Sequence, residues 1–145
     1  MSKLLNWEGL LEGQELEPLE NTTSTQQLVK YAGASHDYYQ IQYDKDYAIS
    51  KGLDGIIVHG ALRCALLGRL ITNWMGSNGF LKKLSCQYRG IDLVGDKLTC
   101  KGIVARKYEE SGNFFCECDI WIENAKGDKT TVGSATIKLQ SGELT

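Results

Sequence analysis

The sequence of 145 residues is poor in proline, in histidine and in net charge, and each shortage narrows the class of protein. Pro18 is the only proline, so no proline-rich linker divides the chain, and we expect one domain over residues 1–145. A formal net charge of -2 argues against a dedicated nucleic-acid-binding protein. No apolar run approaches the ~20 residues of a membrane span, and the first residues do not resemble a signal peptide. We therefore expect a cytoplasmic protein with no nucleic-acid or membrane partner.

The sequence has five cysteines, an odd count that favours reduced thiols over a disulfide framework. Cys116 and Cys118 form the most suggestive pair. Over residues 114–123, however, apolar residues alternate with charged ones, and this period of two is typical of a strand with one buried face. No second cysteine pair lies at zinc-ligand spacing. We predict a structural role for both thiols and no metal site.

Apolar periodicity predicts two short helices, one long helix and then several strands. A capping pattern at Thr23 and Ser24 opens a helix that ends near Gly33, and residues 44–51 form a second short helix. Residues 60–75 are apolar on most faces, so we expect this helix to be buried by a sheet. Strands follow at about 83–88, 97–108, 113–124 and 129–139, with glycine-rich turns between the last three. The predicted class is α+β, an antiparallel meander of about four strands on one long buried helix.

The segment from Tyr31 to Gly60 carries the most specific pattern in the chain. Asp37 follows the first predicted helix, Asp44 comes seven residues later, Tyr47-Ala48 follows, and His59-Gly60 opens the long helix. This pattern resembles the signature of the MaoC-like hydratase/dehydratase family, which includes the R-specific enoyl-CoA hydratases. The resemblance implies a single MaoC-like hotdog domain, with a curved antiparallel sheet wrapped around the long helix.

The resemblance also implies a reaction and a site. The family adds water to a trans-2-enoyl-CoA thioester, or removes it from the 3-hydroxyacyl-CoA, without a metal or organic cofactor. Asp37 falls at the position of the general base, and the backbone N–H of Gly60 at the donor to the thioester carbonyl. A carboxylate suits proton removal from water, and a free N–H at a helix N-terminus suits a developing enolate. We interpret His59 as a buried histidine with a satisfied hydrogen bond.

Gln42 departs from the family pattern, because the family's catalytic histidine falls at this position. An amide can donate and accept hydrogen bonds and so orient a water molecule, but it does not titrate. Three explanations remain open. Asp37 carries the acid–base work alone, the chain is a weakly active or non-catalytic subunit of a two-subunit hydratase, or the glutamine was introduced to trap substrate.

A positively charged stretch is independent of the resemblance. Between Gly55 and Ile91 there is no acidic residue, whereas five basic residues occur there: Arg63, Arg69, Lys82, Lys83 and Arg89. Chance and solvated strand ends explain this equally well as a docking patch for the phosphates of CoA or phosphopantetheine. Lys82, Lys83 and Arg89 flank the strand after the long helix, so they are the candidate substrate-binding residues.

The expected partners follow from the same resemblance. The substrate is an acyl-CoA or acyl-carrier-protein thioester, and two hotdog domains pair their sheets edge to edge. The partner is an identical chain or a related hotdog subunit. Two rival functions remain, a non-catalytic subunit that shapes the acyl site of a catalytic partner, and an acyl-CoA thioesterase that uses the same acid.

Overall fold

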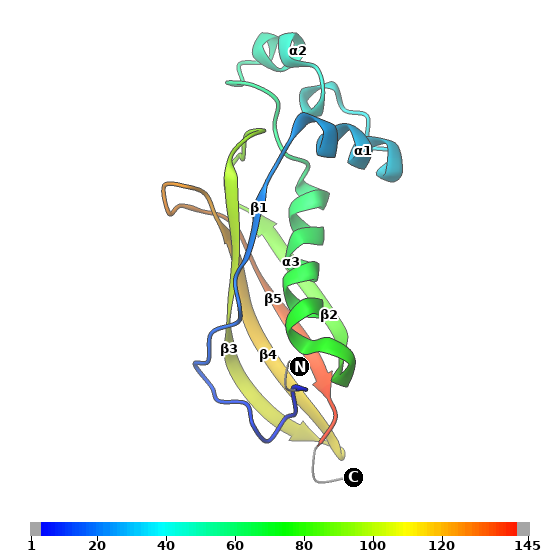
Figure 1. Ribbon diagram of the computed structural model, residues 1–145, viewed down its shortest axis with the longest axis vertical. Helices are drawn as coiled ribbons and strands as arrows, with labels where there is room; N and C mark the ends of the chain where they lie inside the picture. Colours follow the sequence, from blue (N-terminus) through cyan, green and yellow to red (C-terminus); the bar gives the residue numbers. More distant parts are fainter. Residues whose placement is uncertain (1–3, 142–145) are drawn as a thin grey trace.

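The computed structural model describes residues 4–141, which form a five-stranded antiparallel sheet with one long helix across it (Figure 1). The strand order is β1-β3-β4-β5-β2. The strands are β1 (Leu19–Thr22), β2 (Gly79–Tyr88), β3 (Lys97–Glu110), β4 (Asn113–Glu123) and β5 (Lys129–Leu139). The helices are α1 (Thr25–Ser35), η1 (Gln40–Gln42), α2 (Lys45–Ser50), α3 (Gly60–Met75) and η2 (Gly76–Asn78). The predicted α+β class is confirmed.

Helix α3 packs one face against the concave side of the sheet. Its leucines Leu62, Leu66 and Leu70 are buried in the same core cluster as strand residues such as Ile120 and Ile137. The expected burial of α3 by a sheet is confirmed, but it is limited to one side of the helix. Ala61, Ala65 and Arg69 are exposed, because the sheet covers only one side of the helix and these residues lie on the other.

The sheet is not a simple meander. Strands β3, β4 and β5 pair in sequence order, but β2 pairs with β5 and forms the far edge. The chain leaves α3 at this edge, and the segment after β2 returns across the sheet to β3. Backbone hydrogen bonds from Gly90 to Thr130 (3.0 Å) and from Val94 to Ile56 (2.9 Å) hold that segment in place.

The short helices α1 and α2 project beyond the sheet near the N-terminal end of α3 (Figure 1). Ser24 caps α1 by accepting a hydrogen bond from Gln27 N at 3.1 Å, and Asp44 caps α2 in the same way from Tyr47 N at 3.0 Å. Helix α1 ends at His36, whose φ of 58° turns the chain sharply. This turn directs the next residue, Asp37, back toward the body of the molecule.

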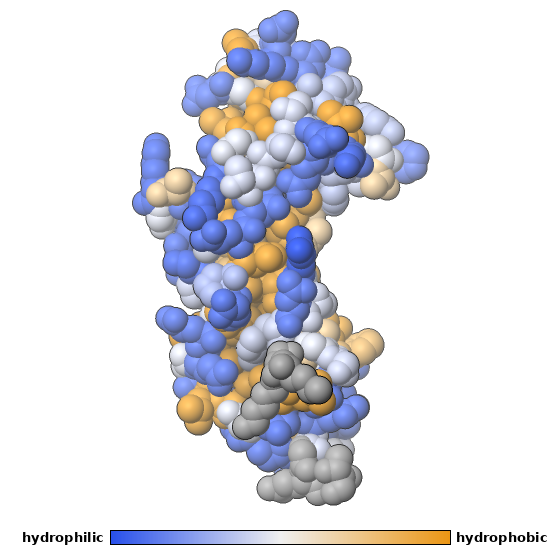
Figure 2. Space-filling view, viewed as in Figure 1, coloured by the Kyte–Doolittle hydropathy of each residue, from blue (hydrophilic) through white to orange (hydrophobic). Residues whose placement is uncertain are grey.

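Two further expectations can be compared with the structure. Cys116 and Cys118 are both fully buried, with their sulfur atoms 3.8 Å apart, so the structural role predicted for this pair is confirmed. Within residues 4–141, no helix combines the length and apolar character needed to cross a membrane. Figure 2 shows hydrophobic residues gathered in the middle of the face on which α3 lies, with hydrophilic residues around them.

Candidate active site

Asp37 lies where α1 meets the start of α3. Its side chain is half-buried, and Oδ1 accepts a hydrogen bond from Tyr39 N at 3.4 Å. Two neighbours respond to its charge. Burial raises the pKa of Tyr31 on α1, and the Asp37 carboxylate raises it further. Burial lowers the pKa of His59, and Asp37 opposes that shift. The carboxylate is therefore close to the residue that immediately precedes Gly60.

Gly60 is the first residue of α3, and the N-terminal turn of this helix has no side-chain cap among the described residues. The backbone N–H groups in the first turn of α3, including that of Gly60, are therefore available as donors at the positive end of the helix dipole. A Cβ on Gly60 would lie 3.0 Å from ring atoms of Tyr88. A larger residue at position 60 would therefore require the Tyr88 ring to shift.

The segment between Asp37 and α2 buries Gln42. This residue ends η1, and its side chain is 7% exposed. Its Oε1 has no hydrogen-bond partner among residues 4–141, although its backbone N–H donates to Tyr39 O at 3.0 Å. Within residues 4–141 no hydrogen bond joins the Gln42 side chain to Asp37. Their pairing in one water-binding site therefore stays a prediction.

His59 differs from its expected state. The side chain is 0% exposed, and neither ring nitrogen has a hydrogen-bond partner among the described residues. The expected hydrogen bond is not formed within bonding geometry, although the backbone of Asp37 lies near the ring. The ring meets an aromatic surface instead of an acceptor, since it lies edge-on to Tyr31 with the two centroids 5.0 Å apart. The backbone carbonyl of His59 accepts a hydrogen bond from Arg63 N at 3.2 Å.

A buried ion pair one turn into α3 was missed by the sequence reasoning. Arg63 Nη1 lies 3.2 Å from Asp92 Oδ2 and also donates to the carbonyl of Gly90 at 2.8 Å. Thr130 Oγ1 donates to the same Asp92 oxygen at 2.7 Å. The Arg63 guanidinium also packs on the ring of Tyr88, 4.9 Å from its centroid. Asp92 is the first acid after the acid-free stretch, and this was the one available signal.

The faces of α3 and β2 meet through small residues on the helix. Gly60 lies against Tyr88, and a Cβ on Gly68 would be 3.5 Å from Leu84. Cys64 lies between the two glycines on the same helical face. Burial and the neighbouring Cys86 thiol raise the pKa of Tyr88 to about 12. The Tyr88 phenol is therefore protonated at neutral pH and is a hydrogen-bond donor beside Gly60.

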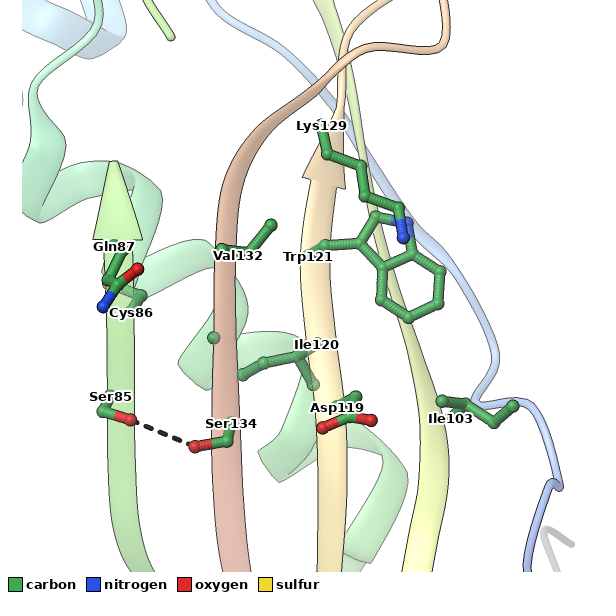
Figure 3. Close-up of a pocket in the computed structure, with 11 residues that line it drawn as sticks. Ser85, Cys86, Gln87, Ile103, Asp119, Ile120, Trp121, Lys129, Val132 and Ser134 are labelled. Carbon is green, nitrogen blue, oxygen red and sulfur yellow. Dashed lines mark hydrogen bonds between the residues drawn. The ribbon is translucent and has the colours of Figure 1, made fainter. Parts of the chain in front are cut away.

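The three candidate phosphate ligands are all exposed, but the structure does not gather them around Gly60. Lys82 lies over the ring of Phe80 at 5.8 Å, and Arg89 donates to Gln87 Oε1 at 2.8 Å. Gln87 faces the side of the sheet opposite α3 (Figure 3). Arg63, by contrast, is neutralised by Asp92 and does not belong to an accessible basic patch. A phosphate-binding role for Lys82, Lys83 and Arg89 stays a prediction.

A cavity of about 690 Å³ opens on that outer face of the sheet. Its lining comes from β2, β3, β4 and β5. Figure 3 shows these side chains and the hydrogen bond between Ser85 Oγ and Ser134 Oγ, which is 3.1 Å long. Trp121 and Lys129 border it, with the ammonium 4.3 Å from the indole centroid. No lining residue comes from the Tyr31–Gly60 segment, so this cavity is separate from the candidate active site.

Comparison with known proteins agrees with the architecture. The family model described as MaoC like domain matches residues 10–112. The (R)-hydratase from A. caviae involved in PHA biosynthesis is 22% identical, with 92% of this chain and 99% of that chain covered and a TM-score of 0.85. R-hydratase PhaJ1 from Pseudomonas aeruginosa is 20% identical, with coverages of 94% and 86% and a TM-score of 0.86.

A third similar structure is the ChsH1-ChsH2 complex from Mycobacterium tuberculosis, with 19% identity, coverages of 90% and 98%, and a TM-score of 0.80. A search of curated proteins found no match. The chain belongs to the MaoC-like family of hydratases and dehydratases, because the family model covers most of its length. The hotdog fold expected from the resemblance is confirmed.

Proposed function

We propose that this protein hydrates a trans-2-enoyl-CoA thioester to the 3-hydroxyacyl-CoA, or catalyses the reverse dehydration, with Asp37 as the general base. The observation that carries this proposal is the position of Asp37. Its carboxylate acts on His59, the residue directly before the uncapped N-terminus of α3. A base and a backbone donor for an oxyanion are thus close together, and this combination is what hydration requires.

The reaction balances with these groups alone. The oxygen of water forms a bond to C3 as Asp37 takes one of its protons. The electron pair of the C2–C3 double bond moves to the thioester, whose enolate oxygen accepts a hydrogen bond from Gly60 N–H. The Asp37 carboxyl group then delivers the proton to C2, which yields the 3-hydroxyacyl thioester and regenerates the carboxylate. The R configuration of the product is an expectation from the family.

Gln42 supports a specific alternative, a weakly active or non-catalytic subunit of a heteromeric hydratase. Its amide can hold a water molecule through the unpaired Oε1, but it cannot move a proton. One of the similar structures is a complex of two different chains. We expect an acyl-CoA or acyl-carrier-protein thioester as substrate, and either an identical chain or a related hotdog chain as partner.

The proposal is tested with Asp37→Asn, which keeps the size of the side chain and removes its basicity. We expect hydration of crotonyl-CoA, followed as loss of the conjugated double bond, to fall by at least the ~10²-fold typical of general acid–base groups. The matched control is Asp54→Asn, an exposed acid outside the site, which should leave turnover unchanged.

Three measurements distinguish the rivals. Release of free thiol without loss of the double bond would assign a thioesterase. Unchanged hydration by folded Asp37→Asn would remove Asp37 from the mechanism. Co-purification with a hotdog subunit that carries a complete Asp/His pair would favour the non-catalytic reading.

A further inference from the structure

We propose that Tyr88 is a further catalytic residue of the same site, and that its phenol hydroxyl donates a hydrogen bond to the thioester oxygen beside the N–H of Gly60. This inference rests on the proposed function, because both donors act on the oxygen that becomes an enolate during hydration. Gly60 supplies one backbone donor, and each additional fixed donor directed at a developing negative charge stabilises it further.

The first argument is the place of the ring. Alternate residues of a strand face the same side, and Leu84 and Tyr88 of β2 both lie against glycines of α3. A Cβ on Gly60 would lie 3.0 Å from both Cε2 and Cζ of Tyr88. Cζ carries the hydroxyl, and the Gly60 nitrogen is bonded to the same Cα as that Cβ would be. The phenol and the backbone donor therefore flank one carbon atom.

The second argument is that the ring is held in this place. The guanidinium carbon of Arg63 lies 4.9 Å from the centroid of the Tyr88 ring, and a cation over an aromatic face stabilises that arrangement. The guanidinium is itself fixed, because Nη1 donates to Gly90 O at 2.8 Å and to Asp92 Oδ2 at 3.2 Å. Both Arg63 and Asp92 are buried. The phenol is thus positioned before a ligand arrives, as an oxyanion donor must be.

The third argument is the state of the hydroxyl. Tyr88 is 49% exposed, so a ligand can reach it although it packs against α3. The Cys86 thiol lies beside the phenol and is only a weak hydrogen-bonding group, and no other hydrogen-bond partner of the hydroxyl is identified among residues 4–141. Burial, and then that thiol, raise the pKa of Tyr88 to about 12. The phenol therefore keeps its proton at neutral pH and serves as a donor.

The role requires no new reactant. As water adds to C3 and Asp37 takes its proton, negative charge develops on the thioester oxygen. Gly60 N–H and Tyr88 O–H both donate hydrogen bonds to this oxygen, and both keep their protons. When the proton is delivered to C2, the carbonyl is restored and the two hydrogen bonds weaken. Tyr88 therefore stabilises the enolate more than the substrate, which changes kcat more than KM.

The first experiment uses Tyr88→Phe, which removes the hydroxyl and keeps the ring that packs on Arg63 and Gly60. We expect kcat for crotonyl-CoA hydration to fall by ~10²-fold, the cost of one oxyanion donor, with KM little changed. The matched control is Tyr108→Phe. Tyr108 is also covered by an arginine, since Arg106 lies 4.3 Å from its ring centroid, but it belongs to β3 and should keep wild-type turnover. Wild-type kcat in Tyr88→Phe would overturn the role.

The second experiment observes the thioester carbonyl directly and does not depend on turnover. The probe is 2,4-hexadienoyl-CoA, whose conjugated thioester absorbs further to the red when its carbonyl oxygen accepts hydrogen bonds. Its spectrum is recorded by rapid mixing with saturating protein, before hydration. Wild type and Tyr108→Phe should give the same red shift, and Tyr88→Phe a smaller one. Equal shifts in all three proteins, or no shift in the wild type, would overturn the donor.

A double-variant cycle tests whether the hydroxyl depends on its place beside Gly60. Gly60→Ala displaces the Tyr88 ring, because the new methyl group would lie 3.0 Å from two ring atoms. In the Gly60→Ala protein, Tyr88→Phe should therefore lower kcat less than it does in the wild type. The matched control is Gly68→Ala, where a Cβ has an ordinary contact with Leu84 at 3.5 Å and the full loss should remain. Equal losses in all three backgrounds would contradict the proposed geometry.

The outcomes separate the two proposals. Wild type that hydrates crotonyl-CoA, with Tyr88→Phe unaffected in kcat and in the spectrum, would overturn the donor and leave the proposed function standing. Wild type that shows the Tyr88-dependent red shift but hydrates no enoyl thioester would overturn the proposed function and leave the donor standing. Wild type that does not bind the hexadienoyl thioester would overturn both. If Gly60→Ala does not fold, the first two experiments still decide the role of the hydroxyl.

Discussion

Gln42 and His59 together raise the question of which residue assists Asp37. Gln42 falls at the position where the family pattern has a histidine, and its buried Oε1 has no partner. His59 has the titratable ring but is fully buried one residue before Gly60. An amide can place a water molecule but cannot transfer a proton, and no hydrogen bond joins either side chain to the Asp37 carboxylate among the described residues.

Gln42→His tests whether the missing proton-transfer group at position 42 limits hydration. An imidazole at position 42 restores a group that can transfer a proton, so hydration should rise, up to the 10²–10⁴-fold range of general acid–base catalysis. A pH dependence near neutrality should appear that the wild type lacks there. The matched control is Gln40→His, which adds the same ring to the same short helix at an exposed position. If Gln42→His folds, binds acyl-CoA and shows no gain, the non-catalytic subunit becomes the better reading.

Among the secondary-structure elements, the buried ion pair of Arg63 and Asp92 ties α3 to the segment that returns from β2. Asp92 is 1% exposed, and its Oδ1 has no hydrogen-bond partner among the described residues. The pair also fixes Tyr88, which packs on the Arg63 guanidinium and covers Gly60. Loss of the pair should therefore loosen the β2 edge and the start of α3 together.

Arg63→Met should lower the free energy of unfolding by about 3–5 kcal/mol, because it leaves the Asp92 carboxylate buried without a counter-charge. Urea unfolding measures the change. Arg69→Met removes an exposed arginine from the same helix and should have little effect. The double variant Arg63→Met/Asp92→Leu should recover most of the loss. A single variant as stable as wild type would show that the pair does not support the fold.

The helices and their caps were predictable because their signals are local. Ser24 and Asp44 act on backbone groups three residues away, and the structure confirms both caps. The position of β2 was not predictable, since the choice between β3 and β5 as partner depends on where α3 crosses the sheet. Arg63 resembled a surface cation for the same reason. Its partner lies 29 residues away in sequence, and only the folded chain brings the two together.

The sequence indicated which residues to consider for the candidate active site, but it did not indicate how their side chains are arranged. The spacing of Asp37 and Gly60 directed attention to the region where α1 meets α3, and the roles of the two residues stay predictions. It did not indicate that the His59 ring would lack a partner, because ring orientation depends on the packing of Tyr31. Nor did it reveal that Tyr88 would cover Gly60, since the two are 28 positions apart and meet through tertiary packing.

At the scale of the whole molecule, the proposed phosphate site depends on the positive charge of exposed side chains. Charge reversal at exposed Lys82, Lys83 and Arg89 should raise KM for CoA esters more than for short pantetheine esters, because the latter lack the nucleotide phosphates. The matched control reverses Lys45 and Lys51, which are exposed on the α2 side. Equal effects on both ester types would show that these three residues do not bind phosphate.

The sheet leaves one long edge open, and this edge is where we expect a second subunit. Strand β2 ends the sheet and pairs only with β5 among the described strands, so one side of its backbone offers free N–H and C=O groups. The register of β2 shifts between Leu81 and Lys83, with Lys82 at the irregularity, and charged residues and irregularities of this kind discourage pairing along that part of an edge. Pairing between two copies should therefore use the regular portion of β2 that begins at Leu84.

Ser85→Asp tests this arrangement. In an antiparallel pairing of two β2 strands around their centre, the new carboxylates would lie near each other, and like charges across strands are destabilising. We expect a weaker dimer, whose subunits dissociate at a higher protein concentration than those of the wild type. Sedimentation velocity measures this change. The matched control is Ser134→Asp. Ser134 is the direct cross-strand partner of Ser85, exposed on the same face, but it lies on the interior strand β5. Equal dissociation in both variants, or in neither, would rule out an interface built on the β2 edge.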